Sequence, residues 1–116
     1  MILGTGIDII EVERIAQSIK KWGDNFLNHV FTPNEIAYAK KNRHPSQHFA
    51  ARFAAKEAVL KAIGDNSHVN WKDIEISHNK HGRPICVYKD KKFKHKILIS
   101  VSHTKNYAVA SAIITS

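Results

Sequence analysis

Apolar residues change their spacing several times along this chain, and each change marks a predicted element. Positions 2–10 are mostly apolar and β-branched, interrupted by Gly4 and Gly6, and this run predicts a buried strand. From Glu11 to Trp22 the apolar residues recur every three to four positions, which predicts an amphipathic helix. The predicted core-facing side of that helix consists of Val12, Ile15, Ala16, Ile19 and Trp22.

Two further helices are predicted in the first half of the chain. A short apolar segment at positions 26–31 leads into Thr32-Pro33-Asn34-Glu35, a capping box with proline at the first helical position. The helix that begins there is expected to reach about Lys41. A longer helix, with Ser46 as its predicted cap, is expected to run to about Ile63, because its alanines and leucine are strong helix formers.

The second half of the chain has the alternation that is typical of β-structure. From Trp71 to His78, Ile74 and Ile76 fall on one face and the residues between them on the other. Three more strands, separated by polar turns and a basic loop, are predicted at positions 84–88, 97–103 and 107–114. A strand, then helices, then an antiparallel β-meander indicate an α+β fold. Residues 1–116 are expected to form one domain.

The positive net charge of the chain indicates which classes of partner it can bind. A formal net charge of +8 favours an anionic partner, which can be nucleic acid, anionic lipid, a phosphorylated ligand or an acidic protein. The single Cys86 excludes an internal disulfide, and no Cys or His motif supports a zinc site. No window approaches the ~20 apolar residues of a spanning helix. The protein is therefore expected to be cytoplasmic, without a membrane partner.

Two groups of residues are candidates for chemistry. Asp8 is a carboxylate within an apolar strand, which is costly unless it is paired or bound to a cation. From its local sequence it is either a structural residue, salt-bridged or capping a helix, or a metal ligand. Glu57 and Lys61 lie one turn apart in the central helix, where the ordinary interpretation is an exposed ion pair worth about 0.2–0.5 kcal/mol. Neither group decides the function by itself.

Taken together, these acidic groups and the residues around them resemble a known family. The segments that carry the resemblance are positions 6–15, 49–62, 82–84, 100–103 and 107–108. They resemble the holo-[acyl-carrier-protein] synthases, the small bacterial members of the 4′-phosphopantetheinyl transferase superfamily. The resemblance implies the fold of that superfamily. It also implies an enzyme of fatty acid biosynthesis that moves the phosphopantetheine arm of coenzyme A to a serine of apo-acyl carrier protein, releasing adenosine 3′,5′-bisphosphate.

The resemblance also implies roles for the candidate residues. Asp8 and Glu57 would hold one Mg²⁺, an ion that is usually bound by one or two carboxylates and keeps several waters. Lys61 would stabilise or protonate the departing bisphosphate. The serine proton would go either to Glu57 or to a metal-bound water that Glu57 orients, and the sequence leaves both options open.

Other residues are expected to contact the two substrates. Those expected at coenzyme A are Arg52, Lys56, Lys61, Gly82, Arg83, Pro84 and His103. Because acyl carrier proteins are acidic, basic side chains on the first helix would guide and orient that partner. These side chains are Arg14, Lys20 and Lys21. The family forms trimers whose active sites are shared between neighbouring subunits, so the resemblance also implies a homotrimer.

The chain departs from the family pattern at two places. The glycine-rich loop that usually follows the central helix has the sequence Gly64-Asp65-Asn66-Ser67-His68, and His48 stands where an acidic residue is expected. An alternative hypothesis is a non-enzymatic nucleic-acid-binding domain, which the net charge of +8 suggests. Against it, the aromatic residues lie mainly at apolar-face positions and no RNP-type, helix-turn-helix or zinc-finger pattern is present. Nucleic acid is therefore not an expected partner.

Overall fold

The computed structural model describes residues 1–116 and contains four α-helices, one short 3₁₀-helix and five strands. In chain order they are β1 (Ile2–Glu11), α1 (Val12–Trp22), α2 (Asp24–Val30), α3 (Pro33–Lys41), α4 (Pro45–Ile63), η1 (Trp71–Asp73), β2 (Ile74–His78), β3 (Pro84–Tyr88), β4 (Lys96–His103) and β5 (Tyr107–Thr115). None of the helices combines the length and hydrophobicity that a membrane crossing requires.

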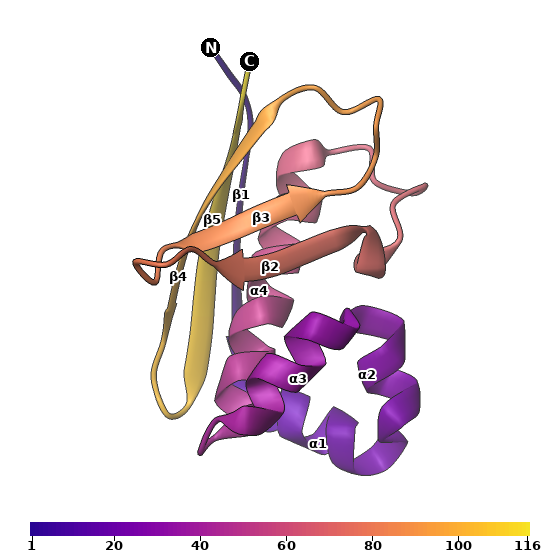
Figure 1. The fold of residues 1–116 in the computed structure, drawn as a ribbon, viewed down its shortest axis with the longest axis vertical. Coiled ribbons are helices and arrows are strands. Elements are labelled where there is room, and N and C mark those ends of the chain that lie inside the picture. The colour runs from indigo at the N-terminus through magenta and orange to yellow at the C-terminus, as the bar shows by residue number, and fades with distance from the viewer.

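The helix α4 is the centre of the molecule. An antiparallel sheet in the order β1-β5-β4 packs along α4, the β2-β3 hairpin crosses near it, and α1, α2 and α3 gather around the N-terminal end of α4 (Figure 1). The predicted α+β fold with antiparallel strands is confirmed. The strands form two separate sheets, because β3 pairs only with β2 and β4 pairs only with β5, so no hydrogen-bonded ladder joins the hairpin to the three-stranded sheet.

Local sequence signals set most of the helix boundaries. The capping box at the start of α3 is confirmed, since the Thr32 side chain accepts a hydrogen bond from the Glu35 backbone N–H and the Glu35 carboxylate accepts one from the Thr32 N–H at 2.8 Å. The apolar segment at 26–31, for which no helix was predicted, lies mostly within the helix α2. The helix α4 begins at Pro45, one residue before the predicted cap Ser46, because proline is preorganised for the first helical position.

One side chain at the end of α1 differs from the predicted pattern. Trp22, predicted to face the core, is 56% exposed, and the Lys21 ammonium lies over its ring at 4.9 Å. The helix α1 therefore buries only its first two turns, where Val12 and Ile15 contact the core. The spacing of apolar residues places Trp22 on the core-facing side of the helix, but it does not show where the neighbouring helix ends and leaves Trp22 exposed.

Two glycines allow β1 to lie directly against α4. A Cβ atom at Gly4 would overlap the carbonyl oxygen of Ala62, and one at Gly6 would overlap that of Ala58. Because successive residues of a strand point to opposite faces, Asp8 shares the α4-facing side with these glycines. The close approach of the two backbones therefore sets how Asp8 is presented to the helix.

We expect Gly6→Ala to push β1 away from α4. The obstructing atom is a backbone carbonyl oxygen that cannot rotate away, so the strand itself must shift. Overpacking of this kind costs about 1–3 kcal/mol. Urea denaturation should show that loss in the free energy of unfolding, and Thr5→Ala, at an exposed position of the same strand, should change it by less. Equal stability of Gly6→Ala and wild type would contradict the packing role of Gly6.

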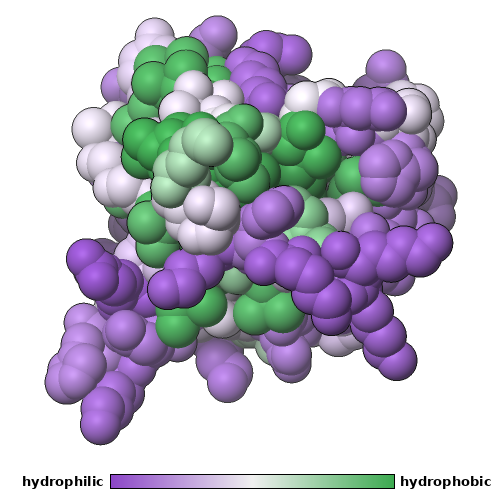
Figure 2. All heavy atoms as spheres, turned by 90° about the horizontal axis from the view of Figure 1, so that it is seen from above, coloured by the Kyte–Doolittle hydropathy of each residue, from purple (hydrophilic) through white to green (hydrophobic).

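The other face of the three-stranded sheet carries exposed apolar side chains. Ile7 and Ile9 on β1 are each 65% exposed, and Leu98 on β4 is 57% exposed. The prediction of a buried strand at 2–10 is therefore correct only for the face toward α4. Viewed from the end of the molecule where the termini lie, apolar side chains form a continuous patch bordered by hydrophilic ones (Figure 2). In a single copy of the chain, much of this apolar surface has no partner.

Candidate active site

A charged group lies where β1 faces α4. The Lys61 ammonium donates to the backbone carbonyl of Ile7 at 3.0 Å and lies 3.4 Å from the Asp8 carboxylate. The sequence allowed a surface ion pair between Glu57 and Lys61, but the ion pair that forms joins Lys61 to Asp8. Lys61 thereby connects β1 to α4. Asp8 is a salt-bridged carboxylate, which was one of the explanations that its local sequence allowed.

Glu57 completes this group from the helix. Burial raises the pKa of the Glu57 carboxyl, the nearby negative charge of Asp8 raises it further, and Lys61 opposes both. The two carboxylates are thus close enough to repel each other. A carboxylate whose pKa is raised toward neutrality accepts a proton more readily, which suits a general base.

The acidic pair fits a hard divalent cation. Asp8 and Glu57 supply oxygen ligands only, and their mutual repulsion is what a cation between them would relieve. No cluster of three or more Asp, Glu, His or Cys side chains suitable for a metal occurs in the chain. A site with two carboxylates matches Mg²⁺, which usually keeps several waters.

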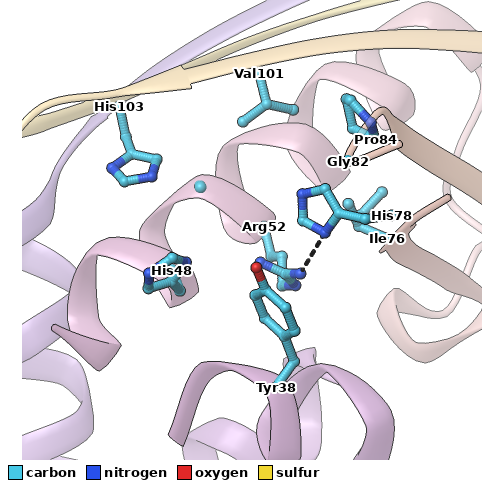
Figure 3. Close-up of a pocket in the computed structure, with 10 residues that line it drawn as sticks. Tyr38, His48, Arg52, Ile76, His78, Gly82, Pro84, Val101 and His103 are labelled. Atoms are coloured by element: carbon cyan, nitrogen blue, oxygen red, sulfur yellow. Dashed lines mark hydrogen bonds between the residues drawn. The ribbon is translucent and has the colours of Figure 1, made fainter. Parts of the chain in front are cut away.

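A cavity of about 220 Å³ opens between α3, α4, β2 and β4 (Figure 3). Four residues expected at coenzyme A contribute to its wall, namely Arg52, Gly82, Pro84 and His103. Sequence reasoning missed three others that also line it, Tyr38, His48 and His78. For these three residues the only signal in the sequence was that His48 stands where the family pattern has an acidic residue.

Arg52 is the central charge of the cavity. It is only 4% exposed, and its guanidinium carbon lies 4.1 Å from the centroid of the Tyr38 ring, a cation–π contact. One terminal nitrogen lies 3.4 Å from Nδ1 of His78, and the buried Nε has no hydrogen-bond partner (Figure 3). A buried donor without a partner is unusual and costly, so the site is suited to an anionic ligand.

Lys56 does not belong to this site, and its expected contact with coenzyme A is wrong. Its side chain is fully buried, and the ammonium lies 2.7 Å from the Glu35 carboxylate. It also donates to the carbonyl oxygens of Val30 at 2.7 Å and Trp71 at 3.1 Å. All three hydrogens of the ammonium therefore have partners inside the protein, and none is available to a phosphate.

The remaining predicted residues lie on the surface. Arg83 is exposed and lines a groove between β3 and β4 instead of the cavity. The docking candidates Arg14, Lys20 and Lys21 are exposed on α1.

The two groups of functional candidates are separate within one copy of the chain. None of Asp8, Glu57 and Lys61 lines the cavity around Arg52. Asp8 and Lys61 instead line a shallow depression together with Ile7, Ile9 and Val109, at the edge strand β1 of the sheet. One chain thus offers an acidic site at one place and a basic cavity at another.

Comparisons with known proteins identify the family. The model of the 4′-phosphopantetheinyl transferase superfamily matches residues 4–112. The holo-[acyl-carrier-protein] synthase of Koribacter versatilis is 49% identical, with 98% of each chain covered. That of Thermodesulfovibrio yellowstonii is also 49% identical, over 99% of this chain and 100% of its own.

Solved structures agree with these relatives. The holo-(acyl-carrier-protein) synthase of Bacillus anthracis in complex with CoA (3′,5′-ADP) is similar with a TM-score of 0.88 and 38% identity, over 100% of this chain and 98% of its own. The Helicobacter pylori synthase in complex with coenzyme A gives a TM-score of 0.85 and 30% identity, over 96% and 99% of the two chains.

Fold and sequence together define a phosphopantetheinyl transferase, so the chain is an enzyme. Within the 4′-phosphopantetheinyl transferase superfamily it belongs to the family of the holo-[acyl-carrier-protein] synthases, whose members match it over essentially its whole length.

Proposed function

We propose that this protein transfers the 4′-phosphopantetheine group from coenzyme A to a serine hydroxyl of an apo-acyl carrier protein. The serine oxygen forms a bond to the phosphorus that carries the pantetheine, and the bond from that phosphorus to adenosine 3′,5′-bisphosphate breaks. The observation that supports this most directly is the convergence of Asp8 and Lys61, 3.4 Å apart, with Glu57 close enough for Asp8 to raise its pKa.

Each of these side chains has a task that its position suits. Glu57 accepts the serine proton, directly or through a water that it orients, from its place beside Asp8 on the helix α4. Lys61 reaches the departing bisphosphate from its exposed position and stabilises the negative charge that develops there. Asp8 and Glu57 would hold Mg²⁺, which would neutralise charge on the pyrophosphate.

Coenzyme A is held by the basic cavity of a neighbouring copy of the chain. Arg52 and His103 contact its phosphates, and Gly82 and Pro84 form the rim near the adenosine, with Arg83 at the outer edge. This arrangement is supported by the separation of the acidic site from the cavity within one copy. It is also supported by the exposed apolar side chains of Ile7 and Ile9, which precede and follow Asp8 along β1 and which a second copy would cover. The assembly we propose is a homotrimer.

The carrier protein binds at the first helix. Arg14, Lys20 and Lys21 are exposed on α1 and complement an acidic partner, so they raise the association rate and make it depend on salt. We place the reaction in fatty acid biosynthesis in the cytoplasm. A nucleic-acid-binding role, the alternative from the net charge of +8, is not favoured because the whole chain matches an enzyme family.

The test of this function is the intact mass of an apo-acyl carrier protein after incubation with the enzyme, coenzyme A and Mg²⁺. A gain of one phosphopantetheine group on its serine, lost when the metal is chelated, is the expected result. An unchanged mass with a carrier protein that a known synthase modifies would overturn the proposal.

The trimer gives a separate prediction. We expect light scattering to show three chains per particle for the wild type, and single folded chains for Leu98→Glu. A carboxylate at this exposed apolar position would be buried without a partner in the assembly. Lys40→Glu, exposed on α3, should leave the particle mass unchanged. A wild-type protein that stays monomeric at enzyme working concentrations would refute the shared site.

A further inference from the structure

The cavity around Arg52 is lined by basic groups from three elements and by no acid. His48 and Arg52 come from α4, His78 from β2 and His103 from β4, and Tyr38 reaches from α3 toward Arg52 (Figure 3). None of the ten residues that line the cavity is an aspartate or a glutamate. A single arginine thus carries the permanent charge, while three histidines surround it with charge that depends on pH.

These histidines are packed close enough to influence one another. The rings of His48 and His103 are 5.4 Å apart between centroids, and Tyr38 lies 5.7 Å from His48 and 5.4 Å from His78. His78 also contacts the Arg52 guanidinium at 3.4 Å, so its Nδ1 accepts a hydrogen bond in the neutral form. Unless an anion is bound, protonating any one of these rings places its positive charge near that of Arg52.

Burial and neighbouring positive charges lower the pKa of both His48 and His78. For His48, burial acts most strongly, followed by His103, Arg52, His78 and His44. For His78, burial is again the larger cause and Arg52 the second. Without a ligand, both rings are therefore neutral at neutral pH, and the cavity holds less positive charge than its residues can supply.

We propose that binding of a phosphate group in this cavity is coupled to proton uptake by His48 and His78, which makes these two histidines determinants of coenzyme affinity. This inference rests on the proposed function, since it takes the phosphates of coenzyme A as the ligand. The phosphate oxygens accept hydrogen bonds from the Arg52 guanidinium and replace repulsion between like charges with attraction to an anion. Each imidazole then becomes a donor at both nitrogens.

The other charged groups around the cluster do not cancel this effect. Burial lowers the pKa of Arg52, and Tyr38 and Glu35 are the groups that raise it. The carboxylate of Glu35 is already paired with Lys56 at 2.7 Å inside the core. His44, at the start of α4, adds to the positive side. The anion is therefore the only partner within reach that compensates protonated histidines.

The sign of the pH dependence follows from this coupling. Protons taken up on binding make the affinity highest at low pH, and the affinity falls as the pH rises, by about tenfold per pH unit for each proton taken up. A phosphate monoester has a second pKa of about 6, so above about pH 7 the ligand is already a dianion and does not itself take up the proton.

The experiment is calorimetric titration of the full-length protein with coenzyme A, and separately with adenosine 3′,5′-bisphosphate and inorganic phosphate, at about pH 7.5. Two buffers of different ionisation enthalpy give the number of protons taken up. We expect net uptake by the wild type with each probe that binds, and its loss in the double variant His48→Gln/His78→Gln. His29→Gln, exposed on α2, is the matched control and should behave as wild type.

The affinity gives a second measurement that a purely structural role would not change. At about pH 6.5 each single variant, His48→Gln or His78→Gln, should bind coenzyme A about tenfold more weakly, as expected for one lost charge-assisted contact. At about pH 8.5, where protonation of the histidines is less favourable, the variants should lose much less affinity relative to wild type than at about pH 6.5. Parallel losses at both pH values, or wild-type binding without proton uptake, would overturn the inference.

This outcome is distinguishable from failure of the proposed function. Transfer to an acyl carrier protein with pH-independent coenzyme binding would remove only the role of the histidines. Proton-coupled binding without any transfer would retain their role and remove the reaction.

Discussion

Glu57→Gln and Asp8→Asn are each expected to lower the rate of phosphopantetheine transfer by at least about a hundredfold. Removing a general base costs about 10²–10⁴ in rate, and either change also removes one of the two carboxylates proposed to hold Mg²⁺. Both replacements keep the size of the side chain, so β1 and α4 should stay packed as in the wild type. The rate is measured as the mass change of an apo-carrier protein over time at saturating coenzyme A.

Controls for this prediction separate lost chemistry from lost structure. Asp24→Asn removes an exposed acid at the start of α2 that is not part of the candidate site, and it should retain wild-type turnover. The midpoint of urea unfolding should change little in Glu57→Gln, because burial disfavours the charged form of this carboxyl. Full activity of both site variants would show that the acidic pair is not the reaction centre.

Lys56→Met is expected to lower the free energy of unfolding by about 3–5 kcal/mol. The change leaves the Glu35 carboxylate buried without its cation, and it leaves the carbonyl oxygens of Val30 and Trp71 without a donor. Since whole domains are stable by only about 5–15 kcal/mol, this loss is a large fraction of the total. The same ion pair joins α4 to α3, and Glu35 extends the connection to β2 by accepting a hydrogen bond from Ile76 N–H at 2.7 Å.

Urea denaturation of a double-mutant cycle tests this network. Glu35→Gln should also destabilise the protein, and the pair Lys56→Met/Glu35→Gln should cost less than the sum of the two single changes, because each single change strands the other partner. Lys41→Met, exposed at the end of α3, is the control and should be nearly neutral. Additive effects within the cycle would show that the two side chains do not stabilise each other.

Elements with local determinants were predicted well from the sequence. The capping box at Thr32 and Glu35 satisfies backbone groups within one turn, so its residues suffice to recognise it. The alternation at Ile74 and Ile76 likewise predicted their buried face, because a strand repeats every two residues whatever lies beyond it. The segment at 26–31 was harder, since a short apolar run is ambiguous between strand and helix.

The site was predicted in part. The resemblance to the transferase family selected Asp8, Glu57 and Lys61, which the fold brings together, and Arg52 and His103, which line the cavity. It failed for Lys56, because the helix α4 is buried nearly all round and its residue pattern does not show which basic side chain points inward.

The amino-acid sequence by itself determined the features that depend on neighbours a few residues away. These are the helices, their caps and the alternating faces of the strands. The family resemblance rests on the same kind of local pattern. Only the tertiary structure decided that Lys56 is a core residue while Lys61 reaches Asp8, and that histidines from α4, β2 and β4 surround Arg52. The physical reason is that pairing, burial and electrostatic repulsion depend on distances between segments remote in the chain. Those distances exist only once β1 has packed against α4 through Gly4 and Gly6 and the hairpin has closed over Arg52.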